Sequence, residues 1–401
     1  MKDYQDSETG QIYAFDDGID PFKLNNRNIP VTLTETVMPK PSESHLWYDG
    51  AWVKDTEVPK GYKPPVSSVP SYNPAWVAFL RPYTVILQSK EDKLQISLEQ
   101  ANSGSYDNDK LSKAVAALPL GQTGFHALIS YDGAIAIPRD IAYPSEDKAT
   151  DEINKILCAI LLGGVHAEVI YQQDLCCGAL NKGKDIFIYT PCSHNRLRNQ
   201  WVSIEERLLP LMHPRVLSVS DLLNAYGHGM SVIGAINNFS SFFLLHGYTA
   251  MAYQNRSDAL ASLWIVVEQL TSFLWEKKFL SNPKFHPASI KKRRDSMKDN
   301  RTWSTAIKHE LLWQTGLLSE GSFVALTSAR KQRNNLVHDG KIPDFSVIRS
   351  LWESLSELFQ SASGLSQSRM QQLSPVEMPR LGFPENNNFD EWQELSEKLK
   401  P

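Results

Sequence analysis

The spacing of hydrophobic residues changes once along this chain, and that change limits the folds that the chain can adopt. Between Pro74 and Pro191, apolar residues come in short runs typical of strands. From about Ser218 onward, apolar residues recur at helical spacing. The sequence therefore predicts an α+β protein, in which a mixed, β-rich domain precedes an all-helical bundle.

The middle of the chain, residues 73–212, is expected to form the mixed domain. We expect its strands over residues 76–80, 83–87, 94–98, 127–131, 134–137, 167–171 and 186–189. The Asp132-Gly133 pair predicts a hairpin, and an apolar face over 150–162, ended by two glycines, predicts a helix. This part of the sequence holds no phosphate-binding glycine loop, catalytic serine elbow or metal-binding histidine pair. A sensory or regulatory role is therefore expected for it.

Residues 213–364 are expected to form a bundle of about five helices. We expect these helices over residues 220–253, with a bend near the start, and over 257–279, 302–318, 323–338 and 344–362. The apolar stripe of the second helix is typical of a face buried in a core. Asp344, which follows a proline, is expected to cap the last helix at its N-terminus.

Two segments without a clear periodicity flank these domains. Residues 1–72 are rich in proline and poor in aliphatic side chains, which predicts an extended, partly ordered arm. Within this arm, residues 9–15 and 46–52 resemble short segments of phage tail-fibre and tail-fibre-assembly proteins. Residues 365–401 form a polar tail, in which 389–399 can make a short helix.

Charge is spread unevenly along the chain, whose net charge is −4. Residues 281–340 carry eleven Lys or Arg against five acidic residues. This distribution argues against a uniformly basic coat and favours local contact with nucleic acid. The first residues lack the apolar stretch of a signal peptide, and no run approaches the length of a membrane span, so we expect a cytoplasmic protein without a membrane partner.

Four cysteines are too few and too clustered for a secreted disulfide scaffold, so reduced thiols are expected. Cys176, Cys177, Cys192 and His194 supply four ligand atoms of the kind that zinc prefers. Zinc-binding cysteines are usually separated by two residues, and an adjacent pair is a poor substitute. Zinc therefore stays the alternative, and no cofactor is expected.

The segment from Arg333 to His338 carries the chemistry that most clearly points to a function. Arg333 and Asn334 precede His338 by five and four residues, and Asp339-Gly340 follows directly. Arginine can hold a phosphate through two parallel hydrogen bonds, and histidine can transfer protons near neutral pH. Gly340 is expected to end the helix, and Asn334, on the same face as His338, is expected to orient the imidazole.

Spacing between an arginine and a histidine does not identify such a site by itself. Arg207 and His213 have a similar spacing, but Pro210 lies between them and would interrupt a helix. The helical setting and the local positive charge therefore favour the segment at Arg333.

These groups are suited to cleaving RNA through attack by a 2′-hydroxyl on its own phosphodiester. The reaction needs a proton acceptor, a proton donor and positive charge at the phosphate. One histidine cannot easily serve both ends of the reaction. A symmetric dimer that joins two copies of the motif is therefore a requirement of the hypothesis.

Residues 256–362 resemble the HEPN domain (higher eukaryotes and prokaryotes nucleotide-binding). Its ribonuclease members carry an arginine, a polar residue, three variable residues and a histidine, which Arg333, Asn334 and His338 match. A weaker family feature, an acidic or polar residue on an upstream helix inside the bundle, is matched by Glu268. The resemblance implies an all-helical homodimer, metal-independent endoribonuclease activity on RNA such as tRNA, and a role as a toxin or in abortive infection and other anti-phage defence, with a phage-encoded trigger.

Several basic residues are candidates for contact with the RNA backbone. They are Lys291, Lys292, Arg293, Arg294, Arg330 and Lys331. The run from Lys291 to Arg294 can equally be a solvated loop, and Arg333 can be a surface ion-pair former beside a helix end. A non-catalytic HEPN-like protein that binds RNA or a partner, and a phage-derived tail-assembly protein, therefore stay open as alternatives.

Overall fold

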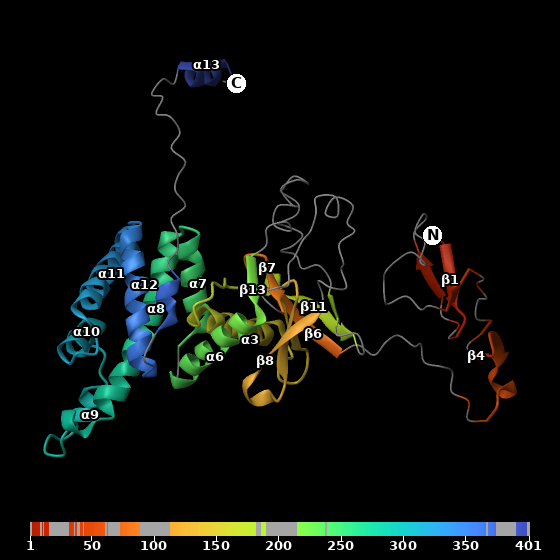
Figure 1. Ribbon diagram of the computed structural model, residues 1–401, viewed down its shortest axis with the longest axis horizontal. Coiled ribbons are helices and arrows are strands. Elements are labelled where there is room, and N and C mark those ends of the chain that lie inside the picture. The colour runs from red at the N-terminus through yellow and green to blue at the C-terminus, as the bar shows by residue number, and fades with distance from the viewer. Residues whose placement is uncertain are drawn as a thin grey trace. The chain divides into compact units, whose positions relative to one another are not determined.

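The computed structural model describes residues 2–8, 10, 12–15, 32–35, 37, 41–42, 44–60, 62, 73–88, 113–181, 186–189, 215–236, 239–365, 368–373 and 390–398 (Figure 1). It divides into two units, Met1–Leu161 with Ala167–Met230, and Leu162–His166 with Ser231–Pro401. Among the described residues, strands are confined to the first unit and long helices dominate the second, which confirms the α+β class. None of the helices in these ranges combines the length and apolar character that a membrane crossing requires.

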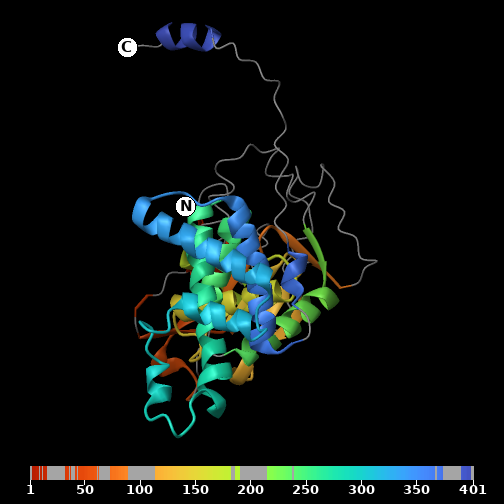
Figure 2. The same ribbon diagram turned by 90° about the vertical axis from the view of Figure 1, so that its left-hand side faces the viewer.

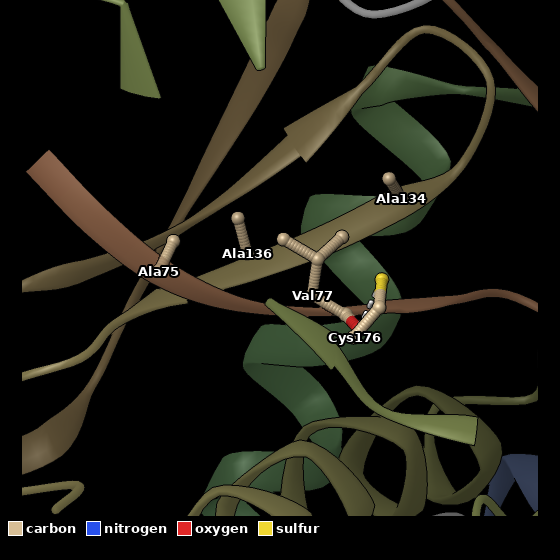
Figure 3. Packing of buried hydrophobic residues seen from close by; sticks show 5 residues of the cluster. All are labelled: Ala75, Val77, Ala134, Ala136 and Cys176. Atoms are coloured by element: carbon tan, nitrogen blue, oxygen red, sulfur yellow. Dashed lines mark hydrogen bonds between the residues drawn. The ribbon is translucent and has the colours of Figure 1, made fainter. Parts of the chain in front are cut away.

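The main sheet of the first unit is antiparallel throughout its described strands. Its strand order is β12-β11-β6-β10-β9-β8. The strands are β6 (Asn73–Phe79), β8 (Ala114–Pro119), β9 (His126–Ser130), β10 (Ala134–Pro138), β11 (Cys176–Asn181) and β12 (Ile186–Tyr189). Small side chains on β6, β10 and β11 pack together at its centre (Figure 3); they are Ala75, Val77, Ala134, Ala136 and Cys176. The predicted hairpin at Asp132-Gly133 is confirmed, because β9 and β10 pair on either side of it.

The strand expected over residues 167–171 is wrong. This segment joins no sheet, and the Asn154 side chain pairs with both backbone groups of Ile170. The amide of Asn154 donates to the Ile170 carbonyl at 2.9 Å and accepts from the Ile170 N–H at 3.0 Å. Asn154 lies on helix α3 (Glu146–Leu162), which confirms the predicted helix. The strand expected over 94–98 lies outside the described residues.

Residues 215–230, which were expected with the helical bundle, belong to the first unit. Strand β13 (Arg215–Ser218) pairs in parallel with β7 (Thr84–Leu87). It leads into helix α6 (Val219–Ala235), which packs so closely on α3 that a Cβ atom at Gly229 would lie 1.8 Å from the Ala159 carbonyl oxygen. This pairing and packing tie the segment to the mixed domain.

The described part of the N-terminal arm contains its own small β structure. Strands β1 (Lys2–Asp6), β2 (Ile12–Phe15) and β3 (Leu33–Thr34) form one sheet, and β4 (His45–Tyr48) with β5 (Ala51–Lys54) forms a hairpin. The Trp47 indole is 4% exposed and donates to the Ser7 carbonyl at 2.9 Å. An aromatic core therefore replaces the aliphatic core that this segment lacks.

The second unit is a helical bundle with one additional short helix. Its helices are α7 (Ser241–Ala252), α8 (Arg256–Trp275), α9 (Arg293–Ser296), α10 (Thr305–Gln314), α11 (Glu320–Asp339) and α12 (Phe345–Ser363). The single helix expected over 220–253 is two helices, α6 and α7, and the Ser240 hydroxyl caps α7 by accepting from the Phe243 N–H. In the tail, α13 (Asp390–Lys398) matches the short helix expected there.

The core of the bundle lies on the faces that the sequence pattern predicts. Leu260, Leu263, Trp264, Val267, Leu270 and Leu274 of α8 are buried, as are Ile348, Leu351, Trp352, Leu355 and Phe359 of α12. A π-helical turn, η4 (Glu276–Leu280), continues α8. Lys277 in this turn donates to the Ala362 carbonyl at 3.1 Å, so α8 and α12 end side by side. The loop from α11 to α12 lies at the opposite end of the bundle (Figure 2).

Candidate functional site

Helix α11, which carries the Arg333–His338 motif, lies on the outside of the bundle. Only Ser322, Leu326 and Ala329 of this helix are buried. Lys331, Asn334 and His338 are exposed, and their spacing of three and four residues places them on one face. The predicted catalytic amide and imidazole are therefore open to a large ligand such as a polymer.

The motif ends where the helix ends, and Gly340 is the reason. Gly340 has φ +66°, a left-handed conformation that residues with a Cβ atom rarely adopt. Its N–H donates to the Leu336 carbonyl at 3.1 Å, and the Lys341 N–H donates to the Asn335 carbonyl at 3.3 Å. The predicted termination at Gly340 is confirmed, and His338 lies in the final turn.

A pair of hydrogen bonds joins the motif helix to the start of α12. The Gln332 amide donates to the Asp344 carboxylate at 3.0 Å and accepts from the Asp344 N–H at 2.8 Å. Asp344 occupies the expected N-cap position, but its side chain makes no capping hydrogen bond to α12. Its carboxylate instead fixes the residue that directly precedes Arg333.

Within the motif, the amide of Asn334 contacts the arginine and not the histidine. Arg333 is half-buried, and its Nη1 donates to Asn334 Oδ1 at 3.4 Å. Among the described residues, no hydrogen bond joins Asn334 to His338. In a single copy of the chain, Asn334 therefore does not orient the imidazole of His338, although both side chains lie on the exposed face.

Glu268, the expected acidic residue of the upstream helix, lies on α8 and is half-buried. Its Oε1 accepts from the Trp264 indole N–H at 2.8 Å, one helical turn earlier. A carboxylate that accepts from an indole orients the ring and is itself partly satisfied. Glu268 therefore has a structural partner in the bundle.

His309 is a buried histidine that the sequence did not single out. It lies on α10, is 2% exposed, and shares a hydrogen bond of 2.8 Å between its Nε2 and the Thr271 Oγ1. The rings of His309 and Trp264 form a T-shaped pair with 6.1 Å between their centroids. Burial, with a smaller contribution from the positive charge of Arg330, lowers the pKa of His309 to about 4. The imidazole is therefore neutral near pH 7.

Arg330, one of the predicted RNA-binding residues, lies near this histidine. Arg330 is half-buried on α11 and close enough to His309 to act on its charge. Lys331, the next residue, is exposed beside the motif. The only sequence signal for this cluster is that Trp264, Glu268 and Thr271 recur at helical spacing on α8. His309 lies 38 residues after Thr271, and the residues around it do not indicate that the two side chains meet.

The run from Lys291 to Arg294 lies at the end of the bundle away from the motif. Arg294 Nη2 lies 4.0 Å from Glu276 Oε1, in the turn whose Lys277 contacts the last residues of α12. Asp344, which contacts Gln332, stands at the first turn of α12. Because α12 has 19 residues, the two ends are separated by about 28 Å. The predicted RNA-binding residues therefore form two groups, although they are close in sequence.

The adjacent thiols of Cys176 and Cys177 lie on opposite faces of β11. Cys176 is buried and its Sγ donates to the Val77 carbonyl at 3.2 Å (Figure 3), whereas Cys177 is exposed and its Sγ lies 3.9 Å from Nη1 of Arg139. Successive residues of a strand point away from each other, so this pair cannot supply two ligands to one ion. Cys192 and His194 lie outside the described residues, and the described ones contain no cluster of three or more metal-ligating side chains.

No protein-family model, no curated protein and no solved structure matches the chain.

Proposed function

We propose that the helical unit is a HEPN-like endoribonuclease that cuts RNA without a bound metal ion. The observation that carries this proposal is the exposure of Asn334 and His338 beside Arg333 at the glycine-capped end of α11. These three residues provide a phosphate-binding cation, a polar group and a proton-transfer group within about two turns of one helix. The first unit would then restrain or trigger this activity.

In the proposed reaction, the 2′-oxygen attacks the adjacent phosphorus and the bond to the 5′-oxygen breaks. One His338 accepts the proton of the 2′-hydroxyl, and a second His338 donates a proton to the leaving 5′-oxygen. Arg333 stabilises the charge that grows on the phosphate oxygens. The products are a 2′,3′-cyclic phosphate and a 5′-hydroxyl.

The second histidine would come from a second copy of the chain. Lys331, Asn334 and His338 lie on a face of α11 that the bundle leaves uncovered. Val324 and Val337 of this helix are 59% and 60% exposed, which is favourable for a contact between two copies. Dimerisation would also bring a second Arg333 to the site. RNA, tRNA among the candidates, and a second copy are the proposed partners, and a phage-encoded trigger in the cytoplasm is the proposed signal.

The decisive experiment incubates the full chain with labelled RNA in excess EDTA and maps the ends of the products. We expect cyclic phosphate ends from the parent, and a loss of about 10²-fold or more in rate for His338→Ala and for Arg333→Ala. His126→Ala is the matched control, because His126 is exposed on β9 in the other unit. The proposal fails if His338→Ala and Arg333→Ala cut RNA as fast as the parent.

A non-catalytic RNA-binding protein is the second candidate. It is favoured by the contact of Asn334 with Arg333 rather than with His338, because an unoriented imidazole is a poor proton carrier. Under this alternative, RNA binds the full chain and stays intact under all conditions tested, including phage challenge. His338→Ala would then leave binding unchanged.

A further inference from the structure

One end of the helical bundle presents six exposed cations that have no ion-pair partner among the described residues. These residues, which we call the basic end, are Lys278, Lys284, Lys291, Lys292, Lys298 and Arg301. Two of the three nearby acidic side chains have partners of their own. Glu276 pairs with Arg294, and the carboxylate of Asp299 accepts from the Thr302 hydroxyl and the Arg301 N–H. Residues 276–301 contain three carboxylates, Glu276, Asp295 and Asp299, which are fewer than the cations, so the basic end carries a net positive charge.

The loops that carry these cations are held by an aromatic core. Trp275 stacks on Phe279 at 4.6 Å and lies 5.1 Å from Trp303 between ring centroids. The Trp275 indole donates to the Met297 carbonyl at 3.0 Å, and Arg293 lies over the Trp303 ring at 5.2 Å. Packing of this kind holds the backbone of these loops in place, so less backbone entropy is lost when a ligand binds.

Lys292 adds a second sign that this surface is built for contact. It has φ +60°, a left-handed conformation that is uncommon for a lysine. Lys291 and Lys292 are both exposed at this turn. The fold thus maintains a locally unfavourable backbone where two adjacent ammonium groups face solvent.

We propose that one RNA strand contacts both the basic end and the Arg333–His338 motif, so that the substrate is an RNA long enough to span the bundle. This inference rests on the proposed function for its second contact point. The two surfaces are about 28 Å apart, the length of α12. At roughly 3.4 Å for each nucleotide of a stacked strand, the span needs about eight nucleotides beyond the cut. Shorter RNA reaches the motif alone.

The test compares a single-stranded RNA of twenty nucleotides with one of three, which is too short to span the bundle even when fully extended, using the full chain. Binding is measured by fluorescence anisotropy on the His338→Ala background, so it reports whether or not the protein cuts RNA. The test variant is Lys291→Gln with Lys292→Gln. The matched control is Lys60→Gln with Lys148→Gln, which removes the same charge from exposed lysines of the first unit.

We expect the test variant to bind the long RNA about tenfold more weakly than the parent and the short RNA equally well. The slope of log Kd against log salt concentration should fall by about 1.4, because each contact to a single strand contributes about 0.7. The control should match the parent. Equal binding of the long RNA by parent and test variant, or equal weakening for both RNAs, overturns the two-point contact. If the expected difference in binding is found, but the chain with His338 intact never cuts RNA, the proposed activity is overturned and the two-point contact is not.

Discussion

Gln332 and Asp344 exchange two hydrogen bonds across the turn that follows the Arg333–His338 motif, at 3.0 and 2.8 Å. This is a side-chain connection between the end of α11 and the start of α12. The turn itself is held by the backbone hydrogen bonds at Gly340. The position of His338 therefore depends on a glutamine that takes no part in the proposed chemistry.

Gln332→Ala should loosen this junction without unfolding the bundle. The hydrogen bonds lie at the exposed surface, so the loss should be about 0.5–1 kcal/mol in the free energy of unfolding. Amide hydrogen exchange should become faster over residues 336–345 in particular. Gln314→Ala is the control, because Gln314 donates to Glu310 within a single helix and connects no other element. Equal exchange rates at the junction in both variants would contradict the role of Gln332.

The glycines at the two ends of α11, Gly321 in its first turn and Gly340 at its C-cap, should respond to alanine in opposite ways. Gly340 has a positive φ and open space around it, so Gly340→Ala introduces backbone strain alone and should cost about 1 kcal/mol. Gly321 has ordinary helical geometry and open space, so Gly321→Ala should stabilise the helix by up to about 1 kcal/mol. Chemical denaturation of both variants measures the difference. A stabilising Gly340→Ala would show that the left-handed cap does not hold in solution.

The sequence was most informative where burial follows a regular stripe. The stripes on α8 and α12 predict the buried faces because each residue contacts a core whose direction the helical period fixes. The period could not place the boundary at residue 230, because it depends on β13 pairing with β7 from a distant part of the chain. It also could not exclude the strand at 167–171, since the partner of the Ile170 backbone is a side chain, that of Asn154, and not a neighbouring strand.

The candidate site shows the same limit. Local signals place Gly340 and the exposed face of α11, because these depend on backbone conformation and spacing within one helix. The burial of His309 depends on packing between separate helices. The distance of Lys291 from the motif likewise depends on how the chain reverses between α8 and α11, which the sequence leaves open.

Helices α3 and α6 approach so closely that only one of two neighbouring glycines should tolerate a side chain. A Cβ atom at Gly229 would lie 1.8 Å from the Ala159 carbonyl oxygen, which is backbone and cannot rotate away. Gly229→Ala should therefore cost several kcal/mol, roughly the upper range for overpacked cores. Gly227 lies on the same helix with no atom near its Cβ position, so Gly227→Ala should stabilise by up to about 1 kcal/mol. Thermal unfolding of both variants tests the contact, and equal midpoints would contradict it.

His309 connects the stability of the bundle to pH. Its pKa is about 4 in the folded chain, against an ordinary value of 6.5, because burial among α8, α10 and α11 disfavours the charged ring. A histidine with a lowered pKa contributes its full stability above pH 6.5. Between pH 6.5 and 4, the unfolded chain binds a proton that the folded chain excludes, so this contribution is lost as the pH falls.

The loss attributable to His309 should reach at most about 3 kcal/mol near pH 4, at 1.36 kcal/mol for each pKa unit. His309→Gln removes the titration and retains a group that can hydrogen-bond to Thr271. Its free energy of unfolding should therefore fall less steeply than that of the parent between pH 7 and 4.5, measured by urea denaturation. His126→Gln changes an exposed histidine and should follow the parent curve. Parallel curves for parent and His309→Gln would mean that His309 is protonated in the folded chain, and hence that water reaches it between the helices.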